Sequence, residues 1–154
     1  MKKIISALLS LIFLFSINVN AEEKLTIEKQ LVGIVGAISG TVKTETRELK
    51  AGDQIYLNET IYAGPGSGTQ ILLLDQSTFT VGEDSEVVMD TFVFDPETND
   101  GKIVASVKQG SLKVISGLIS KKNPDSLTVE VPEGTLGSRG TEFQTIVSKG
   151  KTDT

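Results

Sequence analysis

The sequence predicts an all-β domain, and three observations support this expectation. Apolar and polar residues alternate in several segments, such as Lys102–Lys108 and Ser126–Val131, and a period of two places the apolar side chains on one sheet face. Glycine, aspartate and asparagine interrupt the chain about every 8–12 residues, which is typical of all-β domains. Helical periodicity is weak after the N-terminal segment. The even spacing favours one domain with a rolled or solenoid-like β-sheet after an N-terminal signal helix.

The N-terminal segment has the three-part layout of a secretory signal peptide. Two lysines follow Met1, Ile4–Ile17 is largely apolar, and Val19 and Ala21 stand where small residues precede a cleavage site. We expect cleavage after Ala21, so that residues 1–21 are the signal peptide. A retained anchor helix stays open, although a bilayer span needs about 20 apolar residues and this run is shorter. The segment predicts export to the periplasm, with secretion or cell-surface display as alternatives.

The remaining chain divides into a lead-in segment (residues 22–35), a β domain (36–148) and a polar tail (149–154). No later apolar run is long enough to cross a bilayer, so we expect no membrane span after the signal. In chain order, strands are expected at Gly36–Glu45, Gln54–Tyr56, Ile61–Ala63, Ile71–Leu74, Thr78–Val81, Glu86–Met89, Phe92–Phe94, Lys102–Lys108, Ser111–Ile115, Ser126–Val131 and Glu142–Val147. Continuous apolar residues in Ile71–Leu74 and Phe92–Phe94 predict strands that are covered on both faces.

Turn-forming residues separate these expected strands. Glycine relieves the steric penalty of a positive φ, and an aspartate side chain can bond its own backbone two residues on. The short turns are Ala51-Gly52-Asp53, Asp75-Gln76-Ser77, Gly82-Glu83-Asp84 and Gln109-Gly110-Ser111. Gly64–Gly68 and Asp95–Gly101 form longer loops, and Pro124 marks a further break because it cannot donate to a strand ladder.

The composition excludes several classes of chemistry. The chain contains no cysteine and no histidine, which removes thiol chemistry, the Ser-His-Asp triad and the commonest zinc ligands. Without Lys2 and Lys3, 13 basic residues face 20 acidic ones, a net charge of −7. Such a surface repels phosphates, so we expect no nucleic-acid partner. We also expect no cofactor, no metal and no enzymatic activity.

Three motifs have a structural and a functional interpretation. The glycine-rich Gly64–Gly68 lacks the lysine and helix of a phosphate loop, which favours a β-turn loop. The carboxylates of Asp75, Glu83, Asp84 and Asp90 could hydrolyse a glycosidic bond or hold calcium, but acidic residues at turns are usually solvated turn formers. Tyr56 and Tyr62 favour core or edge packing over a sugar platform.

The segment Ser138–Phe143 is the most unusual in the chain. Gly140 permits a sharp entry into the last strand, and the guanidinium of Arg139 could bond unpaired carbonyls at that corner. Phe143 is expected in the core, with Thr141 and Glu142 beside it. Arg139 or Glu142 could instead contact a partner, although a strand-entry lock is the favoured interpretation.

Together with the segments before it, this string resembles the FecR domain family from about Gly36 to Val147. The matching positions, which the resemblance implies are structural, include Gly52, Asp53, Asp75, Ser77, Ser85, Gly110, Arg139, Gly140, Thr141 and Phe143. Gln76 replaces the glycine that is usual after the aspartate of that turn. The resemblance implies an all-β, solenoid-like domain that in iron-signalling members lies in the periplasm and receives a signal from an outer-membrane transporter.

A signal peptide stands here where those members have an anti-sigma region and a membrane helix, so we expect that the chain does not itself carry a signal across the membrane to a sigma factor, and a link to iron regulation stays open. We therefore expect an exported, non-catalytic protein-interaction or signal-sensing module of the cell envelope, with an envelope protein as its partner. A structural or glycan-associated cell-surface module is the alternative, so a glycan partner stays open. A hydrolase that uses Asp75, Glu83 or Asp84 is a remote third interpretation.

Overall fold

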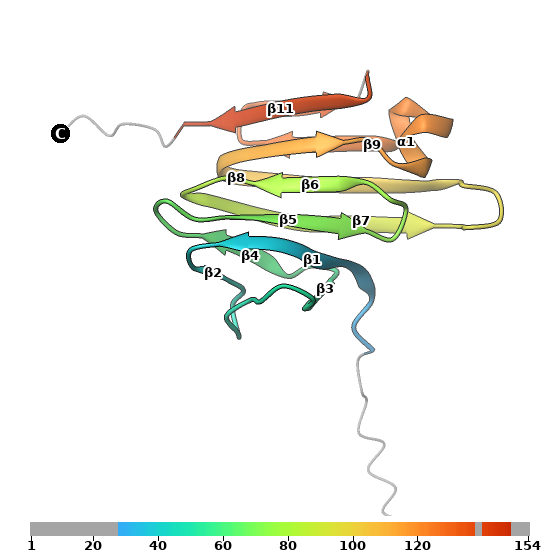
Figure 1. Ribbon diagram of the computed structural model, residues 1–154. Helices are drawn as coiled ribbons and strands as arrows, with labels where there is room; N and C mark the ends of the chain where they lie inside the picture. Colours follow the sequence, from blue (N-terminus) through green and yellow to red (C-terminus); the bar gives the residue numbers. More distant parts are fainter. Residues whose placement is uncertain (1–27, 138–139, 149–154) are drawn as a thin grey trace, which may run out of the picture.

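The computed structural model describes residues 28–137 and 140–148. The expected signal peptide, the polar tail and Arg139 lie outside these residues. Within them, eleven strands form a single domain with one curled sheet, which confirms the all-β, rolled fold (Figure 1). No helix among the described residues is long and apolar enough to cross a bilayer.

The strands follow one another with few interruptions. They are β1 (Leu31–Ser39), β2 (Val42–Lys43), β3 (Gln54–Tyr56), β4 (Thr60–Ala63), β5 (Gly68–Leu73), β6 (Thr78–Val81), β7 (Ser85–Phe94), β8 (Gly101–Ile115), β9 (Leu127–Val131), β10 (Gly134–Gly137) and β11 (Glu142–Val147). A short helix, α1 (Leu118–Lys122), and a 3-10 turn, η1 (Pro124–Ser126), join β8 to β9.

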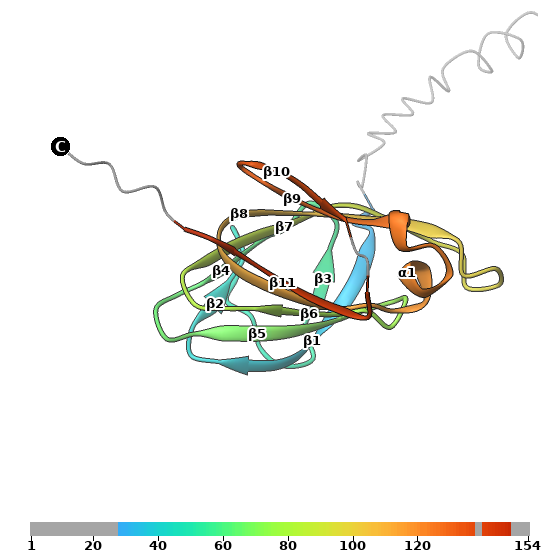
Figure 2. The ribbon, with the colours of Figure 1, turned by 90° about the horizontal axis from the view of Figure 1, so that it is seen from above.

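The sheet curls into two layers that face each other, as the view from above shows (Figure 2). One layer contains β1, β3, β5 and β6 with the second half of β8 and β11. The other contains β2, β4 and β7 with the first half of β8, β9 and β10. We call them the first layer and the second layer. Among the described pairings all are antiparallel except that of β8 with β9.

A bend in β8 lets this strand belong to both layers. Residues 101–109 pair with β7, whereas residues 110–115 pair with β6 and β11. A bulge in the β7–β8 ladder precedes the bend, and Gly110 adopts a φ of 85° there. The expectation of two strands separated by a turn at Gln109–Ser111 is therefore wrong. A glycine and a bulge can redirect a strand from one sheet to the next without ending it.

The core lies between the layers and comes from the inward positions of both. The wholly buried side chains of the first layer include Phe79, Leu112 and Val114, and those of the second include Ile103, Val107 and Leu127. The alternation of buried and more exposed residues in β5, in β6 and in the first four residues of β9 follows from the period of two.

Helix α1 closes one end of the two layers, and the sequence did not predict it. Ile119 is wholly buried and lies against Gly101 at the start of β8. The Lys122 ammonium pairs with Asp100 at 2.7 Å. A connection between parallel strands such as β8 and β9 needs a crossover, often a helix, and five residues are too few to show a periodic apolar pattern.

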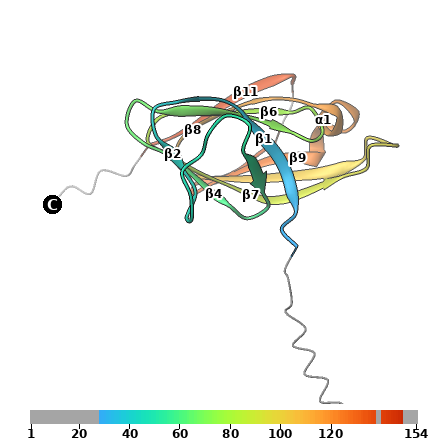
Figure 3. The same cartoon turned by 60° about the horizontal axis from the view of Figure 1, so that its bottom comes forward.

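Two further expectations need correction. The strands around Leu72 and Val93 were expected to be covered on both faces, but these side chains are 48% and 59% exposed, because no third layer covers the outside of the sheet. The lead-in was expected to last to residue 35, but β1, the blue strand in Figure 3, already begins at Leu31. It pairs with β3 and β5.

Candidate functional site

Asp75 and Ser77 form a wholly buried polar cluster at the turn between β5 and β6. The Ser77 N–H donates to Asp75 Oδ1 at 3.0 Å, and the Ser77 hydroxyl donates to Asp75 Oδ2 at 2.8 Å. Between them, Gln76 holds a φ of 69°, the left-handed region in which glycine is favoured. The cluster is a closed turn in which the side chains replace solvent as partners of the backbone.

The same cluster holds the start of α1. The Ile119 N–H donates to Asp75 Oδ2 at 3.3 Å, the Leu118 N–H donates to the Asp75 carbonyl at 2.7 Å, and the Gly117 N–H donates to Ser77 Oγ at 3.0 Å. A side chain at Gly117 would lie 2.7 Å from the carbonyl carbon of Gln76, so glycine is required for this approach. Asp75 therefore accepts the otherwise unpaired N–H groups of a helix start.

A second polar corner forms where β8 bends. The Ser111 N–H donates to Ser85 Oγ at 2.9 Å, and the Ser85 hydroxyl donates to the Glu83 carbonyl at 3.1 Å. A Cβ at Gly110 would lie 2.6 Å from Ser85 Cβ, and still closer to its Oγ and Cα. Ser85 thus packs closely against Gly110, and its hydroxyl oxygen bonds the backbone of Ser111 at the bend.

Gly52 and Asp53 form a turn that is bonded to β1. The Lys50 N–H donates to Asp53 Oδ2 at 2.8 Å, and the Gly52 N–H donates to the Val35 carbonyl at 2.7 Å. Gly52 has a φ of 90°. These bonds give the turn a structural role at the rim of the first layer, beside β3.

The last strand begins at a bonded corner. The Ser116 N–H donates to the Thr141 carbonyl at 2.8 Å, and the Ser116 hydroxyl donates to the Gly140 carbonyl at 3.0 Å. Phe143 was expected in the core; it is partly buried and packs against the core from its edge. Phe143 lies on an edge strand, where only one neighbouring strand covers it.

The carboxylates considered for hydrolysis do not come together. Asp75 precedes β6, while Glu83 and Asp84 follow its other end. Glu83 accepts the Gly66 N–H at 3.0 Å, which ties down the glycine-rich loop between β4 and β5. In residues 28–137 and 140–148, no group of three acidic side chains could hold a metal ion.

Two surface carboxylates have a lowered pKa. A hydrogen bond from the Lys122 ammonium, helped by one from Thr98, lowers the pKa of Asp100. At Glu45, slight desolvation raises the pKa, but hydrogen bonds from Thr60 and from the Glu45 backbone outweigh it, so the pKa is lowered overall. Both groups are acceptors that stay ionised, and neither suits a proton-transfer role at neutral pH.

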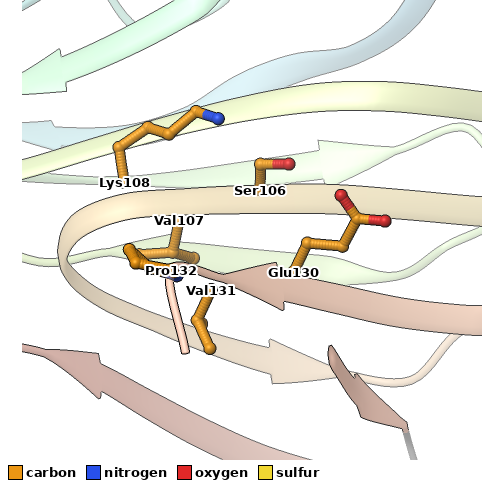
Figure 4. Close-up of a pocket in the computed structure, with 6 residues that line it drawn as sticks. All are labelled: Ser106, Val107, Lys108, Glu130, Val131 and Pro132. Carbon is orange, nitrogen blue, oxygen red and sulfur yellow. The ribbon is translucent and has the colours of Figure 1, made fainter. Parts of the chain in front are cut away.

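A groove runs between the β9–β10 turn and β11. Figure 4 shows its neighbour, a pocket of about 330 Å³ where Val107 and Lys108 of β8 lie beside Val131 and Pro132. The groove itself encloses about 260 Å³, with Val131, Pro132 and Leu136 on one side and Ile146 and Val147 on the other. Among the described strands, β10 pairs with β9 alone and β11 with β8 alone. The groove therefore lies between two strands that each have an unpaired edge.

Comparison with known proteins identifies the family. A family model described as FecR protein matches residues 59–154. The chain belongs to the FecR family. No curated protein and no solved structure matches it. The FecR match spans β4 to β11, and it contains the Asp75 cluster, the bend of β8 and the groove. The FecR family is a regulatory and signalling family, so the domain belongs to a class of signalling modules.

The sequence singled out the FecR motif residues as structural, but it could not show which other elements they contact. Asp75, Ser77, Ser85 and Gly110 all bond or pack against backbone of another element. The groove was missed, because Leu136 and Ile146 stand in separate short segments and only the paired strands bring them together. In the sequence, the sign of this groove was the adjacent apolar pair Ile146 and Val147 in the last strand.

Proposed function

We propose that this FecR-family chain is an exported, non-catalytic module of the cell envelope that binds another envelope protein and so senses or passes on a signal. Family membership supports the signalling class. The signal-peptide layout of residues 1–21 supports export to the periplasm. The absence of cysteine and histidine from the chain supports a role through surfaces instead of catalysis.

The groove between the β9–β10 turn and β11 is the proposed binding site for that partner. An extended segment can add to an unpaired sheet edge through backbone hydrogen bonds, while pockets beside the edge select its side chains. Leu136 and Ile146 are exposed and apolar, so burying them would favour association. The single observation that carries this proposal is the groove between two unpaired strand edges, in which the side chains of Leu136 and Ile146 are exposed.

A photo-crosslinking residue tests the site in the native host at native expression. It would replace Leu136 or Ser148 in the groove, and Val93 on the distant β7–β8 hairpin as a matched control. We expect a defined adduct with an envelope protein from the groove positions and none from Val93. The substitution Leu136→Glu should weaken that adduct when the crosslinker stands at Ser148. Equal adducts at Val93, or none in the groove, would contradict the proposal.

A glycan-associated role is the second candidate, and one observation favours it. The Tyr56 ring lies beside an open hollow, with Lys29 Nζ 5.8 Å and the Arg47 guanidinium 5.7 Å from its centroid. An aromatic ring beside cations suits a sugar polymer that bears carboxylates. Co-sedimentation with purified peptidoglycan, lost on Tyr56→Ala, would support this role, and no retention would count against it.

A further inference from the structure

The outer face of the first layer carries a row of exposed aliphatic side chains and few charges. The register places Ile34 of β1 opposite Leu72 of β5, Leu72 opposite Thr78 of β6, and Thr78 opposite Ile115 of β8. The three aliphatic side chains of this row are 39–48% exposed. Leu74, two residues beyond Leu72, is also exposed. We call this row, with Leu74, the apolar row; β1, β5 and β6 lie side by side in Figure 1.

The neighbouring outward positions of this face are neutral as well. They include Gly36, Gln70, Thr80, Ser111 and Gln144. Two charged residues stand among the outward positions of β1, β5, β6, β11 and the second half of β8 (residues 110–115), namely Lys113 and Glu142. They pair with each other at 2.8 Å. The face therefore has no net charge.

The outer face of the second layer differs. Its outward strand positions carry the charged residues Lys43, Glu86, Asp90, Lys102, Lys108 and Glu130. The whole chain has 20 acidic and 15 basic residues. Two copies of an acidic protein repel each other unless they meet through a surface without net charge. The second-layer positions balance to three basic and three acidic residues, but a second copy would have to match these six charges one by one, whereas the outward strand positions of the first layer carry only the Lys113–Glu142 pair.

We propose that the outer face of the first layer binds a second copy of this chain. A twofold axis near Leu72 and Thr78 would bring the apolar row of one copy against that of the other, as a self-complementary interface requires. Aligned sheets pack face to face at about 10 Å, which suits side chains of this size. A second copy also presents the same neutral surface, so the contact leaves no buried unpaired charge.

The available area sets the strength of the dimer. Five strands about 4.8 Å apart, each about six residues long, cover roughly 450 Å² per copy. Stable interfaces bury about 800 Å² per partner, and smaller ones belong to transient complexes. The dimer is therefore weak, with a dissociation constant on the order of 10–1,000 µM. Because the two copies are acidic overall, added salt tightens it.

Sedimentation equilibrium of the protein purified from the periplasm, over a concentration series to about 1 mM, tests the proposal. We expect a monomer–dimer equilibrium that Leu72→Glu weakens at least tenfold. The matched control Val93→Glu places the same charge on an exposed position of β7 and leaves the dissociation constant within twofold of that of the original chain. A monomer at every concentration overturns the proposal. So does a dimer that Leu72→Glu leaves intact or that Val93→Glu disrupts.

The ion pair gives a second test that does not touch the apolar row. Lys113→Gln leaves Glu142 uncompensated on both copies, and Glu142→Gln leaves Lys113 uncompensated, so each single change should weaken the dimer several-fold. The double change restores the neutrality of the face and returns the dissociation constant of the dimer to within twofold of that of the original chain. Exposed ion pairs contribute little to folding, so monomer stability barely changes. A dimer that is indifferent to all three variants contradicts the role of neutrality and overturns the proposal.

Discussion

The Ser77 hydroxyl donates a 2.8 Å hydrogen bond to the Asp75 carboxylate at a site where neither residue is exposed. The same carboxylate accepts the N–H groups of Ser77 and Ile119. One side chain thus joins the β5–β6 turn to the start of α1, 44 positions away in the sequence.

Asp75→Ala should lower the free energy of unfolding by about 3 kcal/mol, because three buried donors lose their acceptor. Asp75→Asn keeps the shape and should cost less. Urea unfolding followed by circular dichroism measures both, and Asp125→Ala, at an exposed position, is the control with a change within about 0.5 kcal/mol. A near-zero loss for Asp75→Ala would show that water reaches the cluster.

Gln76→Gly should stabilise the domain by about 1 kcal/mol. Gln76 is exposed and has a φ of 69°, where a residue with a Cβ pays a steric cost that glycine avoids. Part of the gain is offset because glycine leaves the unfolded chain more freedom. The control is Gln70→Gly in the middle of β5, which should destabilise. A drop in the midpoint of urea unfolding for Gln76→Gly would refute the strain argument.

Gly110→Ala and Gly52→Ala separate backbone strain from close packing. The two glycines have φ values of 85° and 90°, so alanine is strained about equally at both. A Cβ at Gly52 meets no heavy atom within 4 Å, whereas one at Gly110 overlaps Ser85. We expect a loss of about 1–2 kcal/mol for Gly52→Ala and at least about 3 kcal/mol for Gly110→Ala. Equal losses would mean that β8 can shift away from Ser85.

Phe143→Ala should cost about half as much as Phe79→Ala. Phe79 is 2% exposed at the centre of the core, where truncation removes about 3–5 kcal/mol. Phe143 is partly buried on β11 and contacts the core from the edge. Thermal or chemical unfolding of the two variants gives the comparison. Equal losses would place Phe143 in the core, as the sequence alone had suggested.

The fold class could be predicted from the sequence because the period of two is local. A few residues are enough to identify the buried face in Thr78–Val81 and Leu127–Val131, and the structure agrees. Whether a strand is covered on one face or on both could not be predicted from this local pattern. Leu72 belongs to an apolar run that is typical of a doubly buried strand, yet it faces outward, since the number of layers is a property of the whole sheet.

The motif residues could be found in the sequence, but their partners could not. Asp75 and Ser77 form a recognisable turn, whereas their bonds to Gly117 and Ile119 depend on where β8 returns. Gly110 was expected to end a strand, because glycine marks both turns and bends and only the pairing with β6 and β11 distinguishes them. The groove and the neutral face also depend on pairing.

Since β8 supplies backbone to both layers, the layers are continuous through the bend at Gly110. Moving one layer away from the other would open that bend and expose the core residues that are buried between them. The short strands β2, β3 and β10 lie at the rims and can loosen at far smaller cost. Any movement that accompanies binding is thus confined to the periphery, around an interior that acts as a rigid frame.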